Sequence, residues 1–138
     1  MNKVRFTNKD ILSAERNFRI NLINSISGIK SVNLISTISQ SGVSNLAIFS
    51  SVIHLGSNPP LLGFVLRPET RRLSDTMQNV REMKYFTINQ ISSSQVKPAH
   101  QTSKKIDTNK SEFVEFGFKE LFINSIKVPF VEDSKIKI

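Results

Sequence analysis

Arginines beside a predicted helix start are the first feature of the sequence that could bind a ligand. The segment Leu66–Arg72 carries Arg67 at the end of a predicted strand and enters a helix with Thr70 as its expected N-cap. The first turn of a helix offers unpaired N–H groups and partial positive charge, which favour a phosphate. Arg67 and either Arg71 or Arg72 could add charge-assisted hydrogen bonds. The alternative is an ordinary capped helix with exposed arginines.

A second polar stretch, Asn45–Ser51, lies in a predicted strand and reads Asn-Leu-Ala-Ile-Phe-Ser-Ser. A planar ring ligand needs hydrogen-bond donors at its polar edge and a flat apolar bed. The backbone amides of a bent strand could supply the donors, supplemented by the side chains of Asn45, Ser50 and Ser51. The alternative is a strand whose hydroxyl groups are satisfied by its neighbours.

Two histidines complete the candidates. His100 lies in a polar loop, Ala99–Ser103, where it could border a redox site or carry a proton. An exposed histidine without a role is the favoured interpretation. His54 falls in an apolar strand and is interpreted as structural, and two distant histidines do not make a metal site.

Composition limits the classes of protein to consider. The 138 residues suggest one domain, and the net charge of +8 attracts anions such as nucleic acid, acidic membranes or phosphate-bearing small molecules. The charges are spread out, and one tyrosine with no tryptophan offers little for stacking on bases, so nucleic acid is not favoured. The absence of cysteine excludes disulfides and cysteine catalysis and is compatible with the cytoplasm. No apolar run is long enough to span a bilayer.

The N-terminal part predicts one amphipathic helix. Apolar residues at spacings of three and four indicate a helix over 10–26, capped by Asn8 or Asp10 and stopped by Gly28. Its Asn and Ser content favours a break into two pieces.

The remainder predicts strands with helices around them. Strand 45–55 alternates poorly, which suits a strand covered on both sides or one that bends at Ser50–Ser51, and the continuous apolar run Leu61–Leu66 predicts a buried strand. The expected elements are strands at 32–39, 45–55, 61–66, 85–89, 122–129 and 131–138, a hairpin turn at 40–43 with Gly42 at positive φ, a loop at 56–60, a helix at 71–83 with Leu73, Met77 and Val80 inward, a loop at 91–109 with a helical turn near Ala99, and core candidates Phe113, Phe116 and Phe118. We therefore expect a mainly β fold, a small antiparallel barrel with peripheral helices.

Several well-known catalytic patterns are absent. The sequence holds no Gly-x-Gly-x-x-Gly turn, no Walker loop and no Gly-x-Ser-x-Gly elbow, and no acidic pair stands out for hydrolysis. A nicotinamide cofactor, if used, would have to bind without a dinucleotide-binding fold.

The order and spacing of these segments resemble the flavin reductase-like family of FMN-binding split barrels, close to its flavoprotein oxygenase or flavin reductase domain proteins. The resemblance runs from Ala14 to the last residue. It is carried by Gly28–Thr37, Ser41-Gly42, Asn45–Ser51, Ser57–Pro60, Leu66–Thr70, Tyr85–Asn89 and Ala99–Ser103.

The resemblance implies a six-stranded split barrel that forms a homodimer and binds one FMN per subunit. Family members usually continue beyond this point, so the barrel is expected to be incomplete at its C-terminal side. The implied FMN contacts are Asn45, Ala47, Ile48, Phe49, Ser50 and Ser51 at the ring and ribityl chain, Arg67, Thr70 and Arg71 at the phosphate, and His100 and Thr102 in a loop near the ring.

We therefore expect a flavin-dependent oxidoreductase, in which NADH or NADPH passes hydride to N5 of FMN. The cofactor carries that chemistry, so no catalytic acid or base is named and no metal is expected. The alternatives are an FMN-binding module without reductase turnover and, from another class, a basic barrel that binds nucleic acid.

Overall fold

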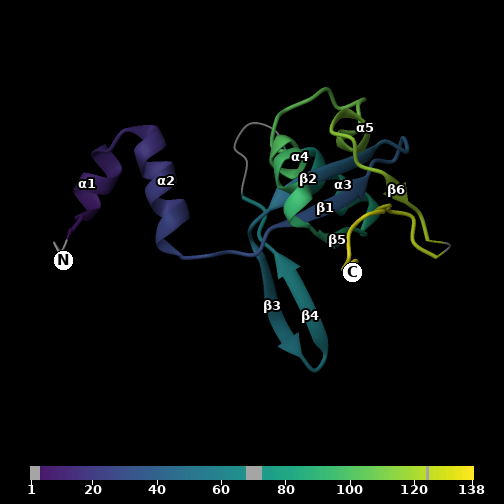
Figure 1. Ribbon diagram of the computed structural model, residues 1–138, viewed down its shortest axis with the longest axis horizontal. Helices are drawn as coiled ribbons and strands as arrows, with labels where there is room; N and C mark the ends of the chain where they lie inside the picture. Colours follow the sequence, from purple (N-terminus) through teal and green to yellow (C-terminus); the bar gives the residue numbers. More distant parts are fainter. Residues whose placement is uncertain (1–3, 68–72, 124) are drawn as a thin grey trace. The chain divides into compact units, whose positions relative to one another are not determined.

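The computed structural model describes residues 4–67, 73–123 and 125–138. The chain divides into two compact units, Met1–Lys30 and Ser31–Ile138, which are described separately (Figure 1).

The first unit holds two short helices, α1 (Asn8–Ser13) and α2 (Arg16–Ile26). The predicted break of one helix into two is confirmed, and α2 ends just before Gly28, which adopts φ +76°. The N-cap of α1 is Thr7, not Asn8 or Asp10. The Thr7 hydroxyl accepts the amide of Asp10 at 3.2 Å, and the Asp10 carboxylate accepts the Thr7 amide at 2.8 Å.

The second unit is built on a three-stranded antiparallel sheet in the order β2-β1-β5. Its strands are β1 (Asn33–Ile38), β2 (Ser44–Phe49) and β5 (Thr87–Gln90). The predicted turn between the first two strands is confirmed, with Gly42 at φ +84°. Ile35 of the central strand pairs with both neighbours.

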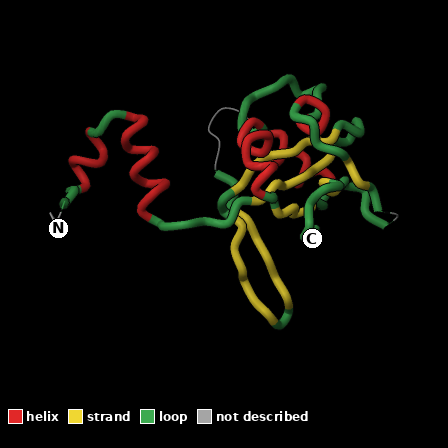
Figure 2. Tube along the Cα trace, viewed as in Figure 1, coloured by secondary structure: helices red, strands yellow, loops and turns green. Residues whose placement is uncertain are grey.

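The next two strands form a hairpin that extends away from this sheet (Figures 1 and 2). The predicted strand 45–55 does bend at Ser50–Ser51, and the bend separates β2 from β3 (Val52–Ser57), which pairs with β4 (Pro60–Phe64) in a sheet of its own. The loop expected at 56–60 is shorter than predicted, because its ends belong to these strands.

The expected burial of Leu61–Leu66 is wrong. Leu61 is 50% exposed, Leu62 39% and Val65 56%. A continuous apolar run predicts burial only where other layers cover both faces of a sheet, and these residues lie in or just after a two-stranded hairpin.

Helix α3 (Asp75–Met83) begins later than predicted. Its N-cap is Ser74, whose hydroxyl accepts the amide of Met77 at 3.3 Å, so the expected start at Arg71 is wrong. Thr70, the predicted cap, lies outside the described residues, as does Arg71 itself.

The inward face of α3 also differs from the prediction. Its buried residues are the polar Thr76 and Asn79, whereas Leu73, Met77 and Val80 are only half-buried. The most buried face of this helix is therefore polar and is offset from the face that apolar spacing predicts. The hydrogen bonds that explain the difference are described with the site below.

The C-terminal part has shorter elements than predicted. The loop expected at 91–109 contains a 3₁₀ turn and α4, which confirms the helical turn near Ala99. The strand expected at 122–129 is wrong, since none of the described residues in that range is in a strand. Of the strand expected at 131–138, only Val131 lies in a strand, and Lys137 forms an isolated bridge with Asn89. Ile138 nevertheless pairs with β5, exchanging backbone hydrogen bonds with Ile88 at 2.7 and 2.9 Å. The elements are η1 (Ser93–Gln95), α4 (Val96–Gln101), α5 (Glu112–Glu115), β6 (Glu120–Leu121) and β7 (Phe130–Val131).

The second unit is thus a mainly β fold with helices around it. Within the described residues its strands form three small sheets, of three, two and two strands, rather than one closed sheet of six.

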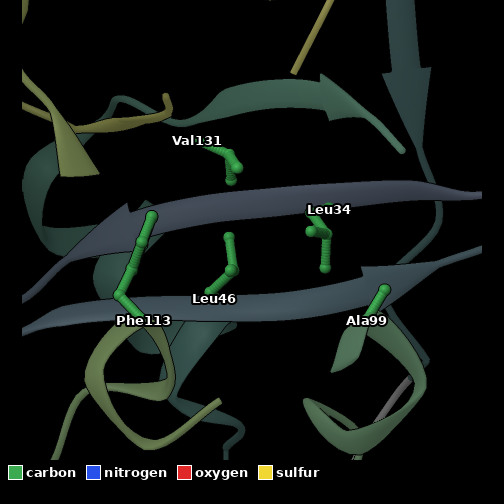
Figure 3. Close-up of a cluster of buried hydrophobic side chains, with 5 residues drawn as sticks. All are labelled: Leu34, Leu46, Ala99, Phe113 and Val131. Carbon is green, nitrogen blue, oxygen red and sulfur yellow. The ribbon is translucent and has the colours of Figure 1, made fainter. Parts of the chain in front are cut away.

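The hydrophobic core lies between the three-stranded sheet and the short helices. Leu34 and Leu46 project from β1 and β2, Ala99 and Phe113 reach them from α4 and α5, and Val131 comes from β7 (Figure 3). Phe113, a predicted core residue, is fully buried. This core fixes α4 and α5 against β2, and the candidate site lies at that junction.

Candidate functional site

A buried polar network joins β1, β2 and α3. The side-chain amide of Asn45 donates to the hydroxyl of Thr37 at 3.2 Å and to that of Thr76 at 3.1 Å, and the amide of Asn79 donates to Thr37 at 3.1 Å. All four residues are at least nine-tenths buried. Buried amides and hydroxyls need such partners, which explains why α3 turns a polar face toward the sheet.

Two pockets adjoin this network and share the side chains of Asn45, Asp75 and Glu112. We call them the amide pocket, of about 230 Å³, and the lysine pocket, of about 170 Å³. The amide pocket is lined by Ser39, Ser41, Val43, Asn45, Asp75, Gln78, Asn79, Thr108, Asn109, Lys110 and Glu112. The lysine pocket is lined by Asn45, Ala47, Leu73, Ser74, Asp75, Thr76, Thr102, Lys104, Lys105, Ile106 and Glu112.

Glu112 is the most unusual group in this region, because it is a carboxylate that is only 7% exposed. Its Oε2 accepts the backbone N–H of Leu46 at 3.0 Å. Burial raises the pKa of Glu112; the N–H groups of Leu46 and of Glu112 itself offset part of that rise, and the charge of Asp75 adds to it.

Glu112 is not among the residues that the sequence predicts. Its position beside Phe113 is not a signal of burial, because neighbouring residues on a helix point in different directions, and Val114, on the other side of Phe113, is 82% exposed. The partner of Glu112, Leu46, is far away in the sequence, so only the tertiary structure reveals the contact.

The structure brings three of the predicted site residues together in the lysine pocket: Asn45, Ala47 and Thr102. The side-chain amide of Asn45 donates to Thr37 and Thr76 in the buried network, and the hydroxyl of Thr102 donates to the carbonyl of Ala99 at 2.8 Å. Both side chains therefore hold the pocket in shape, and the surface left for a ligand comes from the other atoms around them.

The other described candidates do not line this pocket. Ile48 packs against the core, and the ring of Phe49 meets that of Phe64 edge-on at 5.0 Å. Ser50 is exposed, and the Ser51 hydroxyl donates to the carbonyl of Val65 at 3.0 Å at the base of the hairpin.

Two more candidates, Arg67 and His100, are exposed and are not among the lining residues. The last two, Thr70 and Arg71, fall in the range 68–72, outside the described residues. The roles given to these residues stay predictions.

The lysine pocket is lined by charged groups of both signs. Lys104 and Lys105 are exposed and can attract an anion, whereas Asp75 and Glu112 oppose one close to them. The pocket is smaller than the about 300–1,000 Å³ usual for small-molecule sites. The donor set therefore suits part of a phosphate-bearing ligand, with the remainder held by neighbouring residues.

The described ranges (4–67, 73–123 and 125–138) contain neither a metal-binding cluster nor a membrane-spanning helix. No group of three or more His, Cys, Asp or Glu residues there is placed to hold a metal ion. None of the helices there is both long and apolar enough to cross a membrane.

Comparison with known families identifies the family to which this mainly β unit belongs. Residues 29–138 match the family model described as a flavin reductase like domain. The chain therefore belongs to the flavin reductase-like family.

Solved structures agree with this assignment. A crystal structure of a candidate flavin reductase with a split barrel domain, from Shewanella frigidimarina, is 40% identical, with a TM-score of 0.89, over 98% of this chain and 66% of that one. Nitrilotriacetate monooxygenase component B from Bacillus cereus gives a TM-score of 0.85 at 21% identity, over 99% of this chain and 67% of that one. The latter likeness supports the fold alone.

Curated relatives are more distant. A protein of Halalkalibacterium halodurans is 29% identical over 95% of this chain and 62% of its own length, and one of Aquifex aeolicus is 27% identical over 76% and 54%. Both are named as uncharacterized proteins. The chain thus spans between half and two thirds of the length of these relatives.

Proposed function

We propose that this chain is an FMN-binding flavoprotein that acts as an NAD(P)H-dependent flavin reductase. The observation that carries the proposal is the meeting of Asn45, Ala47 and Thr102 in one pocket with Lys104 and Lys105. Membership of the flavin reductase-like family supports a flavin as the ligand.

In this proposal the flavin ring lies along β2 beside Ala47, whose small side chain leaves room for it. Lys104 and Lys105 attract the anionic ligand to the pocket, and Arg67, Thr70 and Arg71 hold the phosphate. A bound flavin supplies the redox chemistry; the chain supplies binding, orientation and exclusion of water.

The experiment that tests this proposal is the visible spectrum of the purified protein after addition of FMN and desalting. We expect about one flavin per chain to be retained, and its absorbance to bleach when NADH or NADPH is added without oxygen. Retention without bleaching by either nucleotide would favour the second candidate, an FMN-binding module without turnover. Loss of all flavin on desalting from a folded chain would contradict a firmly bound flavin and would leave flavin as a passing substrate.

Arg67 offers a matched comparison. Arg67→Ala should weaken FMN binding by about tenfold or more if the arginine makes a charge-assisted contact worth about 1.5–3 kcal/mol. Lys127→Ala is the control, because Lys127 is exposed and lines neither pocket. Equal affinities in the two variants would remove Arg67 from the phosphate site.

We also propose a homodimer, supported by the hairpin of β3 and β4. Residues 31–66 contain no Asp, Glu, Lys or Arg in a chain of net charge +8, so this segment is where two like-charged copies could approach. The hairpin exposes Leu55, Leu61 and Leu62 and borders an apolar groove of about 740 Å³. A two-stranded hairpin with so much exposed apolar surface has little stability alone.

Three finer expectations stay proposals alongside the dimer. They are a six-stranded barrel, a single flavin reductase-like domain over residues 1–138, and a cytoplasmic location. None is needed for the binding experiment above.

A further inference from the structure

We propose that Glu112 is the positioning residue of the flavin pocket and that its proton is coupled to binding of a phosphate-bearing ligand there. The coupling rests on the proposed function, whereas the positioning role can be tested without any ligand. Neither role is needed to explain how a flavin is recognised, so the inference concerns how the pocket is held and regulated.

The position of Glu112 at the edge of the sheet supports the first part of the proposal, its positioning role. Strand β2 is an edge strand, since the sheet order is β2-β1-β5. The N–H of Leu46 bonds to the Glu112 carboxylate at 3.0 Å, so a side chain takes the place that a neighbouring strand would occupy. This carboxylate fixes the free edge of the strand.

The residues on either side of Leu46 link this contact to the pocket. Asn45 and Ala47 flank it in the chain, and both line the lysine pocket. A shift of the Leu46 amide would therefore move both pocket residues. Phe113, next to Glu112, is fully buried in the core and anchors the short helix from which the carboxylate projects.

The charges around Glu112 support the second part of the proposal, the coupling of its proton to ligand binding. Asp75 of α3 lines both pockets with it, Lys104 and Lys105 line the lysine pocket with it, and Lys110 lines the amide pocket. On its own helix, Glu115 is exposed. Glu112 thus already sits in a site where burial and a second carboxylate favour its neutral form.

A ligand that carries a phosphate would bring negative charge toward the two lysines of the pocket, even with the phosphate itself held by the neighbouring residues proposed above. This charge would favour the neutral form further, so the pKa of Glu112 should be higher in the bound state than in the free state. Affinity would then be greatest below the free-state pKa and would fall as pH rises through the bound-state pKa. A single coupled proton changes affinity by at most about tenfold per pH unit.

The ligand-free test is a pH titration of backbone amide resonances in the intact chain. We expect the chemical shift of the Leu46 amide to follow the protonation of Glu112 in the wild type, with a midpoint above that of an ordinary glutamate. Glu112→Gln should abolish this titration, because the side-chain oxygen of glutamine can still accept the hydrogen bond but the glutamine amide does not ionise. Glu115→Gln, on the same helix, should titrate like the wild type. A Leu46 amide that fails to titrate in the wild type, or titrates equally in Glu112→Gln, would overturn the positioning role.

The coupling test compares the Kd for FMN as a function of pH in the same three proteins. The phosphate of FMN itself titrates near pH 6 and affects all three alike, so the signal is the difference between profiles. We expect the affinity of wild type and Glu115→Gln to fall more steeply with pH than that of Glu112→Gln. Parallel profiles would overturn the coupling. Absence of FMN binding at every pH would overturn the proposed function and the coupling together, while the Leu46 titration would still decide the positioning role.

Discussion

Replacing Asn45 with alanine tests whether this residue holds the pocket in shape or serves mainly as a ligand contact. The side-chain amide donates to Thr37 at 3.2 Å and to Thr76 at 3.1 Å, and all three residues are buried. A neutral hydrogen bond contributes about 0.5–1.5 kcal/mol net, so loss of two should lower the free energy of unfolding by about 1–3 kcal/mol. Thr37 would keep its bond from Asn79, which limits the loss.

Urea unfolding at equilibrium, followed by circular dichroism, measures this change. A double-mutant cycle with Thr76→Val isolates the contact between β2 and α3, and we expect a coupling energy of about 0.5–1.5 kcal/mol. Ser50→Ala is the control, because Ser50 is exposed and lies in the same predicted flavin-binding stretch; its effect should stay within about 0.5 kcal/mol. Additive effects of Asn45→Ala and Thr76→Val, within about 0.3 kcal/mol, would refute the reasoning.

Three further predictions concern the core, the hairpin and the N-terminal unit. Phe113→Ala should lower the free energy of unfolding by about 3–5 kcal/mol, since Phe113 is fully buried, and a loss under about 1 kcal/mol in urea unfolding would contradict its central place in the core. Leu61→Lys should weaken self-association measured by sedimentation equilibrium without changing the unfolding curve of the monomer, and unchanged association would remove the hairpin from the dimer interface. Hydrogen bonds from Thr7 lower the pKa of Asp10, and those from the amides of Asn17 and Phe18 lower the pKa of Glu15. Asp10 belongs to the cap of α1 and Glu15 is the N-cap of α2, so both carboxylates stabilise their helices above the ordinary pKa values of aspartate and glutamate. Helix content in residues 4–30, read from carbon chemical shifts, should fall as pH drops through the lowered pKa values; constant helix content would show that the caps contribute nothing.

Local patterns in the sequence predicted local structure well. The break in the N-terminal helix follows from weak helix formers, and the turn at Gly42 follows from a residue that tolerates positive φ. The family resemblance predicted the flavin reductase-like assignment, which the match over residues 29–138 confirms. Asn45, Ala47 and Thr102 also line one pocket, and their role in binding a flavin stays a prediction.

Features that depend on distant contacts were not predictable in the same way. The run at Leu61–Leu66 is apolar enough for a core, but nothing local reveals that its hairpin leaves the main sheet. The polar face of α3 is buried because it forms hydrogen bonds with the sheet. Asn45 of the sheet donates to Thr76 of the helix, and Asn79 of the helix donates to Thr37 of the sheet. Tertiary hydrogen bonding thus outweighed apolar periodicity in that helix.

The pocket itself illustrates the same limit. Glu112 stands beside Phe113 in the sequence, yet its importance depends on the amide of Leu46, which packing alone brings to it. Lys104 and Lys105 of the lysine pocket likewise lie in the loop after α4, and no local sequence motif predicts that this loop lines a pocket.

The central claim, that a flavin binds in the lysine pocket, is tested most directly by mapping FMN-induced changes in amide chemical shift on the whole chain. The proposal predicts saturation at about one FMN per chain, with the largest changes in amide chemical shift at Asn45, Ala47 and Thr102. Changes concentrated in the hairpin groove, around His54 and Leu62, would contradict this placement. No change at any residue of a folded chain would contradict flavin binding altogether.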